Sequence, residues 1–170
     1  MTGAHARSVF RVLVLCTGNS ARSQIGEALI ATKGKTRAAG RVEAESAGSH
    51  PAARVNPYAV ETLEAHGIAW QNRTPKSIGD IEGERFDLVI TVCDSARDAC
   101  PFFPGAEAQV HWGLPDPADE TEPEAARRAF EDTYDALEAR VDALLALPLE
   151  GMAPKELKRR AEAIHLDVDA

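Results

Sequence analysis

The sequence lacks both an excess of basic residues and any long apolar run. Its 19 Lys and Arg face 27 Asp and Glu, which gives a formal net charge of −8. Nucleic acids and anionic membranes favour basic surfaces, so neither is expected as a partner. No stretch approaches the ~20 apolar residues of a membrane helix, and residues 1–8 hold no apolar core of signal-peptide length. We therefore expect a cytoplasmic protein whose anion site is local, built from backbone amides and one or two arginines.

Cysteine is also scarce, with Cys16, Cys93 and Cys100 as the only three. An odd number argues against a fixed disulfide framework, and the absence of a C-x-x-C pair argues against structural zinc. The 5 histidines show no ligand spacing, so no metal site is expected. In a reducing cytosol a disulfide is more often transient and catalytic than structural. The count alone is equally compatible with three buried core cysteines.

Short apolar runs alternate with segments of helical periodicity. Strands are expected at 9–15, 42–46, 86–92 and, more weakly, 108–112, and helices at about 22–33, 56–66 and 122–147. Strands that alternate with helices require crossover connections, which favours a parallel sheet covered on both faces. We expect one α/β domain over residues 9–147, a three-layer sandwich with a four-stranded parallel sheet flanked by helices.

Residues 148–170 form a separate C-terminal helical extension in this prediction. Residues 154–165 have the pattern of a short amphipathic helix with the basic run Lys158-Arg159-Arg160. We expect a solvated helical appendage, and a partner-binding helix is the alternative.

The most informative stretch is the loop between the first strand and the first helix. It consists of Cys16, Thr17, Gly18, Asn19, Ser20, Ala21, Arg22 and Ser23. Its backbone N–H groups can turn inward around an oxyanion, and Arg22 adds a planar, bidentate clamp. The helix N-terminus adds unpaired N–H groups and a favourable dipole. The same field stabilises a thiolate, which makes Cys16 the candidate nucleophile.

Individual residues of this loop have expected roles. Gly18 allows the backbone to approach a ligand closely, and Asn19 tolerates a left-handed conformation. Ser23 can donate a hydrogen bond to the Cys16 sulfur. A nearby Gly34-Lys35-Thr36 is similar to the end of a nucleotide-binding loop, but it follows the helix and lacks the glycine required five residues earlier, so we reject it.

The loop, taken with Asp116-Pro117, resembles the low-molecular-weight protein tyrosine phosphatases. The resemblance implies that Cys16 attacks phosphorus, that Arg22 holds the equatorial oxygens and that Asp116 protonates the leaving group. As an acidic loop residue between two prolines, Asp116 is also compatible with simple solvation of a turn. Ala118 and Asp119 stand where phosphotyrosine phosphatases commonly carry aromatic residues, which favours a small inorganic oxyanion.

A longer pattern is similar to the thioredoxin-coupled arsenate reductases of the same superfamily. It comprises Val92-Cys93-Asp-Ser-Ala-Arg-Asp-Ala-Cys100-Pro101, His111-Trp112-Gly113 and Asp116-Pro117-Ala118, and the resemblance covers about 9–147. It implies arsenate or phosphate as ligand, no bound cofactor, and thioredoxin or a similar thiol as electron donor. In the implied relay Cys93 attacks the Cys16 sulfur, arsenite leaves, and Cys100 then attacks Cys93. His111 is expected to be structural rather than catalytic.

The same resemblance implies a monovalent cation site. Some arsenate reductases of this type bind potassium beside the cradle, through residues that match Asn19, Glu27, Ser46 and Thr74. A further acidic ligand is implied two residues after the threonine, where this chain has Lys76. We expect the Lys76 ammonium group to replace the ion, to pair with Glu27 and to order Asn19. The alternative is a solvent-exposed lysine in a turn.

Two other functions remain open at this point. The first is a tyrosine phosphatase of low molecular weight, whose additional cysteines only protect Cys16 from oxidation. The second is a non-catalytic oxyanion or redox sensor that signals through Cys93 and Cys100.

Overall fold

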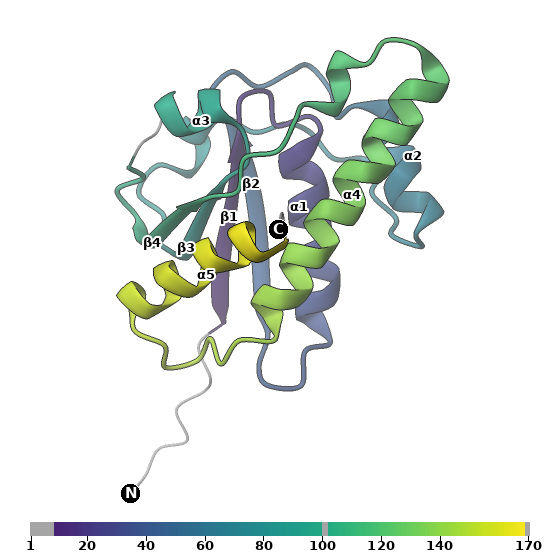
Figure 1. Cartoon of the computed structure of the whole chain (residues 1–170). Helices are drawn as coiled ribbons and strands as arrows, with labels where there is room; N and C mark the ends of the chain where they lie inside the picture. Colours follow the sequence, from purple (N-terminus) through teal and green to yellow (C-terminus); the bar gives the residue numbers. More distant parts are fainter. Residues whose placement is uncertain (1–8, 100–101, 169–170) are drawn as a thin grey trace, which may run out of the picture.

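Four parallel strands form the centre of the protein, and helices cover them (Figure 1). The computed structural model describes residues 9–99 and 102–168. The strands are β1 (Phe10–Cys16), β2 (Val42–Gly48), β3 (Phe86–Thr91) and β4 (Ala106–His111), in the spatial order β2-β1-β3-β4. The expected α/β fold with a four-stranded parallel sheet is confirmed.

Helices connect the strands and pack on the sheet. They are α1 (Arg22–Lys35), α2 (Pro57–Ala65), α3 (Asp94–Ala99), α4 (Pro123–Leu145) and α5 (Pro154–Val168), with the 3-10 turns η1 (Ile78–Ile81) and η2 (Pro117–Asp119). α1 packs on β1 and β2, α4 packs on α1 and α2, and α5 packs on β4. The other face of the sheet carries a smaller apolar cluster that includes Ile81 of η1 and Phe103.

The central strand β1 shows why the strand pattern was clear in the sequence. Val12 and Val14 belong to the main core with Ile25 of α1, whereas Leu13 and Leu15 belong to the smaller cluster. The four β1 side chains are at most 1% exposed. A parallel strand buried on both faces gives a continuous apolar run instead of an alternating one.

The ends of α2 match the expected capping signals. The Asn56 side chain accepts a hydrogen bond from Tyr58 N at 2.9 Å, and Pro57 occupies the first turn. Gly67 follows the helix with a φ of 81°, a left-handed conformation that favours glycine. By contrast, α3, η1 and η2 were not among the expected elements, because their 6, 4 and 3 residues are too short to show a periodic pattern.

The expectation of a solvated C-terminal helix is wrong. Leu157, Ala161 and Ile164 of α5 are buried in the main core, and α5 lies against β4 and α4 (Figure 1). The Trp112 indole N–H donates to the Ala161 carbonyl at 2.9 Å. The amphipathic pattern was visible in the sequence, but the surface that it covers was not. The basic run Lys158-Arg159-Arg160 does face solvent, where Glu156 pairs with both arginines.

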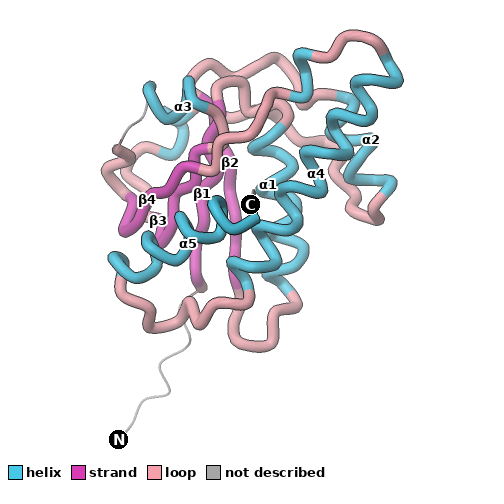
Figure 2. Tube along the Cα trace, in the orientation of Figure 1, coloured by secondary structure: helices cyan, strands magenta, loops and turns pink. Residues whose placement is uncertain are grey.

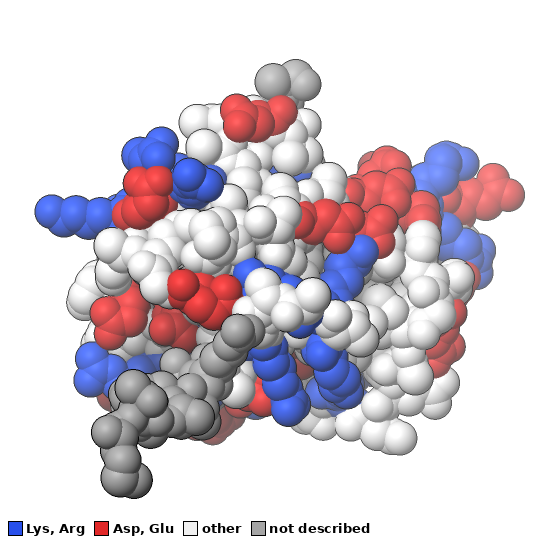
Figure 3. Space-filling view, turned by 90° about the horizontal axis from the view of Figure 1, so that it is seen from below, with Lys and Arg blue, Asp and Glu red and all other residues white. Residues whose placement is uncertain are grey.

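The two ends of the sheet differ in character. Long loops meet at the end nearest α3, where the strands finish (Figure 2). From below, the opposite side, acidic and basic side chains are interspersed and form no single basic patch (Figure 3). Within residues 9–99 and 102–168, no helix is long and apolar enough to cross a membrane. Open α/β sheets place their ligands at the carboxyl ends of the strands, so we expect the site among these loops.

Leu157→Ala tests the packing of α5. We expect it to lower the free energy of unfolding by about 2–5 kcal/mol, because it leaves a cavity in the core. Leu166→Ala on the same helix, at a side chain that is 70% exposed, is the matched control and should change stability by less than about 0.5 kcal/mol. Urea unfolding of both variants measures the difference. Equal effects would show that α5 does not contribute to the core.

Candidate active site

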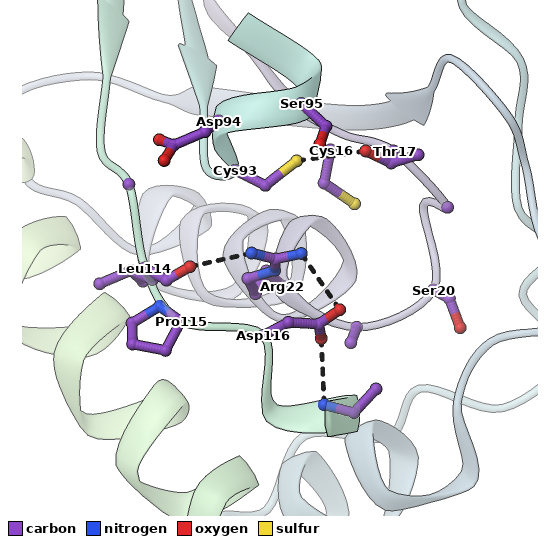
Figure 4. A pocket seen from close by; sticks show the side chains of 14 residues that line it. Cys16, Thr17, Ser20, Arg22, Cys93, Asp94, Ser95, Leu114, Pro115 and Asp116 are labelled. Carbon is purple, nitrogen blue, oxygen red and sulfur yellow. Dashed lines mark hydrogen bonds and ion pairs between the residues drawn. The ribbon is translucent and has the colours of Figure 1, made fainter. Parts of the chain in front are cut away.

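One pocket collects most of the predicted site residues (Figure 4). It lies at the carboxyl ends of β1 and β3 and is closed by the loop that follows β4. Cys16, Arg22, Cys93 and Asp116 all line it, and they come from segments far apart in the sequence. Cys100 lies outside the described residues.

Backbone hydrogen bonds from a neighbouring segment fix the loop after β1 through its carbonyl groups. The carbonyls of Thr17, Gly18 and Ser20 accept hydrogen bonds from backbone N–H groups of the segment between β2 and α2, at 2.8–2.9 Å. Asn19 adopts the predicted left-handed conformation, with a φ of 49°. Gly48 of β2 is required here, because a Cβ atom would collide with the Thr17 carbonyl and lie 2.9 Å from Asn19 N. The loop therefore has a fixed shape before any anion binds.

Cys16 is almost fully buried and receives hydrogen bonds on its sulfur. Asn19 N donates to Sγ at 3.2 Å, and Ser23 Oγ lies 2.9 Å from it. Ser23 Oγ also accepts from Asn19 Nδ2 at 2.9 Å, which leaves the Ser23 hydroxyl hydrogen free to point at the sulfur. The predicted contact between Ser23 and Cys16 is present. Both contacts direct hydrogen-bond donors at the sulfur.

Arg22 and Asp116 face each other across the mouth of the pocket (Figure 4). Arg22 donates to the Leu114 carbonyl at 2.8 Å, and its NH2 group lies 3.4 Å from Asp116 Oδ2. The other oxygen of Asp116 accepts from Ala118 N at 3.0 Å at the start of η2. Asp116 therefore both caps a turn and presents its carboxyl group to the pocket.

Cys93 enters the pocket from the start of α3. Its carbonyl accepts from Arg97 N at 3.1 Å, and its Sγ accepts from Ala96 N at 3.3 Å. Thr17 Oγ1 lies 3.4 Å from the same sulfur. Cys93 thus caps the N-terminus of α3, and its sulfur also contacts Thr17 in the loop after β1. Two buried thiols share one pocket lined by Arg22.

The sequence matches the low molecular weight phosphotyrosine protein phosphatase family over residues 11–163. This chain belongs to that family. The match extends past residue 147 and includes most of α5, in agreement with the packing of that helix.

Several curated relatives of this chain are arsenate reductases. The protein from Brevibacillus brevis is 36% identical over 130 residues, which cover 76% of this chain and 90% of the relative. Those from Bacillus anthracis and Halalkalibacterium halodurans are each 39% identical, over 68% and 63% of this chain and 83% and 73% of the relatives.

Solved structures show the same fold. An arsenate reductase in the phosphate binding state superimposes with a TM-score of 0.68 at 26% identity, over 81% of this chain and 98% of its own. A thioredoxin-dependent arsenate reductase from Corynebacterium glutamicum gives 0.57 at 29% identity, over 81% of this chain and 64% of its own. A low molecular weight protein tyrosine phosphatase from T. tengcongensis, 23% identical, shares the fold at 0.63, over 78% of this chain and 95% of its own.

The residues of the expected cation site contact one another and neighbouring protein groups. Ser46 donates to Glu27 Oε1 at 2.6 Å and accepts from Asn19 Nδ2 at 2.8 Å. Asn19 Oδ1 accepts from the main-chain N–H of Lys76 at 2.8 Å. The second oxygen of Glu27 lies 3.6 Å from the Arg73 guanidinium. Each of these oxygens thus already accepts from a protein donor or lies beside a protein cation.

This arrangement corrects the expected role of Lys76. The Lys76 ammonium group lies 3.8 Å from Glu45, so it does not pair directly with Glu27 as expected. Arg73 makes that ion pair instead and stacks on Trp70, with its guanidinium carbon 3.8 Å from the ring centroid. Lys76 does order Asn19, but through its backbone and not through its charge. Thr74 is exposed.

Glu27 is a buried carboxyl group whose pKa is raised. Desolvation by burial is the main cause, and it outweighs the hydrogen bond from Ser46 and the charges of Lys76 and Arg73, which lower the pKa. Burial disfavours the charged form of an acid. The neighbouring cations therefore only partly compensate a carboxylate that sits beneath the active-site loop.

Sequence reasoning missed several residues that shape this site. Gln24 donates to the Asn19 carbonyl at 3.0 Å and accepts from the Trp70 indole at 2.9 Å. Arg73 and Trp70 lie in a loop without periodicity, so no pattern identified them. Asp94 and His111, which pair at 2.8 Å beside Cys93, were visible only as parts of longer motifs. Within residues 9–99 and 102–168, no group of three or more His, Cys, Asp or Glu could hold a metal ion.

Glu27→Gln tests the raised pKa through the pH dependence of stability. A carboxyl group whose pKa is higher in the folded than in the unfolded state stabilises the fold below its ordinary value of 4.5, and this contribution is lost as pH rises through the folded pKa. The variant removes that loss. Its free energy of unfolding, measured in urea, should therefore improve relative to wild type as pH rises through this window. Glu43→Gln, at a half-buried residue of β2, is the control, and parallel curves for Glu27→Gln and wild type would contradict the assignment.

Proposed function

We propose that this protein reduces arsenate to arsenite, with Cys16 as the nucleophile and a disulfide relay through Cys93 and Cys100. The observation that carries the proposal is the second thiol: Cys93 lines the same pocket as Cys16 and Arg22. Hydrolysis of a phosphate ester requires only the first cysteine. The arsenate reductases among the relatives, at 36–39% identity, support the same reaction.

The first step is binding and attack. Arsenate resembles phosphate in charge and shape, and a related arsenate reductase is solved in the phosphate binding state. In this protein the loop from Thr17 to Ser23 and Arg22 bind the oxyanion, while the hydrogen bonds to the Cys16 sulfur favour the thiolate. The thiolate forms a bond to arsenic, and one arsenate oxygen leaves as water. Asp116, at the rim of the pocket, is placed to supply a proton to that oxygen.

The second step transfers the electrons. The Cys93 thiolate attacks the Cys16 sulfur, the sulfur–arsenic bond breaks, and its electron pair stays on arsenic, which passes from As(V) to As(III). Arsenite leaves, and a Cys16–Cys93 disulfide remains. Thr17 directly follows Cys16 in the sequence, and its hydroxyl lies 3.4 Å from Cys93 Sγ, so the second thiol lies beside the loop of the first.

The third step renews Cys16. Cys100, which lies outside the described residues, attacks Cys93 and leaves a Cys93–Cys100 disulfide for a dithiol such as thioredoxin to reduce. Residues seven apart on a helix are separated by about 10.5 Å along the axis, whereas a disulfide requires Cα atoms about 4.4–6.8 Å apart. Since 94–99 are helical, we expect α3 to unwind at least in part during this step. A cytosolic location, where thiols are kept reduced, fits this chemistry.

A phosphatase is the second candidate function, and the family match favours it. Cys16, Arg22 and Asp116 suffice for phosphate-ester hydrolysis, so weak activity on aryl phosphates is part of the proposal. Among the described residues that line the pocket, Ala118 lies at the rim and none is aromatic, which favours a small oxyanion over phosphotyrosine. Arsenate-dependent consumption of NADPH with thioredoxin and its reductase tests the proposal. A sensor would give no turnover, and a phosphatase would consume only aryl phosphate.

Substitution of each cysteine separates the steps. Cys93→Ser should lose arsenate turnover and keep any aryl-phosphate hydrolysis. Cys100→Ser should complete one turnover and stop as a Cys16–Cys93 disulfide, which peptide mass spectrometry after one exposure to arsenate detects. Cys16→Ser, the control, should lose both reactions. Sustained multiple turnover by Cys100→Ser would contradict the proposed disulfide relay.

Exchange of potassium for sodium tests whether Arg73 and Lys76 replace the cation of related enzymes. At constant ionic strength, arsenate reduction by the unmodified protein should not respond, because Glu27 already faces Arg73 and Asn19 is already held. The double variant Arg73→Ala, Lys76→Asp removes both positive charges and adds a carboxylate, and it should gain a potassium response. Strong potassium activation of the unmodified protein would rule out the replacement.

A further inference from the structure

His111, the last residue of β4, joins two elements at the edge of the active site. Its Nε2 lies 2.8 Å from Asp94 Oδ1, and its Nδ1 lies 2.8 Å from Thr91 Oγ1 at the end of β3. Asp94 is the first residue of α3 and follows Cys93 directly. The imidazole therefore connects the sheet to the helix that Cys93 caps.

The surrounding groups support the donation from His111 to Asp94. A carboxylate only accepts hydrogen bonds, so Nε2 must carry the proton that points at it. Nδ1 can then accept from the Thr91 hydroxyl, or it can donate to it when the hydroxyl turns to the Val110 carbonyl, 3.4 Å away. The hydrogen bond from His111 is also the largest cause of the lowered pKa of Asp94, which keeps this carboxyl group ionised.

Gly113 gives independent evidence that this contact is built into the fold. A Cβ atom at that position would lie 2.7 Å from His111 Nε2 and 3.4 Å from Asp94 Oδ1. Any other residue would therefore push the imidazole away from Asp94. The absence of a side chain at Gly113 leaves the space in which the two groups meet.

The helix that this contact holds is short and exposed. α3 has 6 residues, and of these only Ala96 is buried. Helices of this length are marginal on their own, so an anchor outside the helix has a large effect on whether it stays wound. The Cys93 sulfur depends on that winding, because it accepts a hydrogen bond from Ala96 N in the first turn.

We infer that His111 is a positioning residue for the second thiol: through Asp94 it keeps the first turn of α3 wound and the Cys93 sulfur in the pocket of Cys16. The inference rests on the proposed relay and adds to it a residue that touches neither the oxyanion nor a sulfur. Release of the contact is then part of the unwinding that brings Cys93 to Cys100.

The first test measures hydrogen exchange of amides 94–99 in the reduced protein, which needs no arsenate. His111→Ala should raise exchange about tenfold, as expected when a hydrogen bond to a charged group is lost. Gly113→Ala should do the same by displacing the imidazole, while His111→Gln, which keeps an N–H donor, should restore protection. His66→Ala is the matched control, since His66 pairs with Glu131 at 2.5 Å between α2 and α4. Unchanged exchange in His111→Ala would overturn the inference.

The second test measures the chemistry in a Cys100→Ser background. After one exposure to arsenate, His111→Ala should form the Cys16–Cys93 disulfide about tenfold more slowly, while the phosphate concentration that half-protects Cys16 from iodoacetamide stays the same. Raised exchange with an unchanged disulfide rate would overturn the positioning role. If no disulfide forms with His111 in place, the relay itself fails, and the exchange experiment still decides whether His111 holds α3.

Discussion

The hydrogen bond from the Lys76 backbone to the Asn19 side chain fixes the geometry of the active site. A backbone N–H can only donate, so Asn19 must present its oxygen to Lys76 and its NH2 group to Ser23 and Ser46. That orientation aims the Ser23 hydroxyl at the Cys16 sulfur. With the amide reversed, the Lys76 N–H would face an NH2 group and lose its acceptor, at a cost of about 1–3 kcal/mol for an unsatisfied group. The two serine hydroxyls would have to turn toward Asn19 and away from Glu27 and the Cys16 sulfur. The hydrogen bond from Ser23 to the Cys16 sulfur thus depends on Lys76, a residue 60 positions away from Cys16 in the sequence.

The parallel sheet explains why two distant cysteines share one pocket. β1 and β3 are neighbours, with Leu15 opposite Thr91 in register, and Val92 N donates to the Leu15 carbonyl at 3.0 Å. Cys16 follows Leu15 and Cys93 follows Val92, so the two cysteines lie where β1 and β3 end, at the same edge of the sheet. Carboxyl ends of adjacent parallel strands are where open α/β sheets place their ligands. In the proposed relay, this strand pairing is what brings the two thiols into one pocket.

Features that depend on a few consecutive residues could be predicted from the sequence, whereas contacts between distant segments could not. The strand of Leu13 and Leu15, the cap at Asn56 and the left-handed Asn19 were predictable, because each depends on a few consecutive residues. The partner of Glu27 was not, because Arg73 and Lys76 lie in one irregular loop and only the folded chain shows which cation reaches the carboxylate. The same holds for α5, whose apolar face was visible although the surface beneath it was not. The thiol of Cys100 lies outside the described residues, and its role stays a prediction.

The two described thiols are held in ways that match their parts in the proposed relay. In that relay Cys16 returns to one position in every cycle, and it is held by buried groups: Asn19 and Ser23 are fully inaccessible to solvent. Cys93 would form bonds first with Cys16 and then with Cys100, which requires it to move. Its position depends on a six-residue helix and on a contact through Asp94, whose side chain is 75% exposed. A contact with one exposed partner can be broken at a smaller cost than a contact between two buried groups. The groups that hold Cys16 are buried, whereas the contact that holds Cys93 is exposed at Asp94 and can be released. A phosphatase that uses only Cys16 would have no need of the second arrangement.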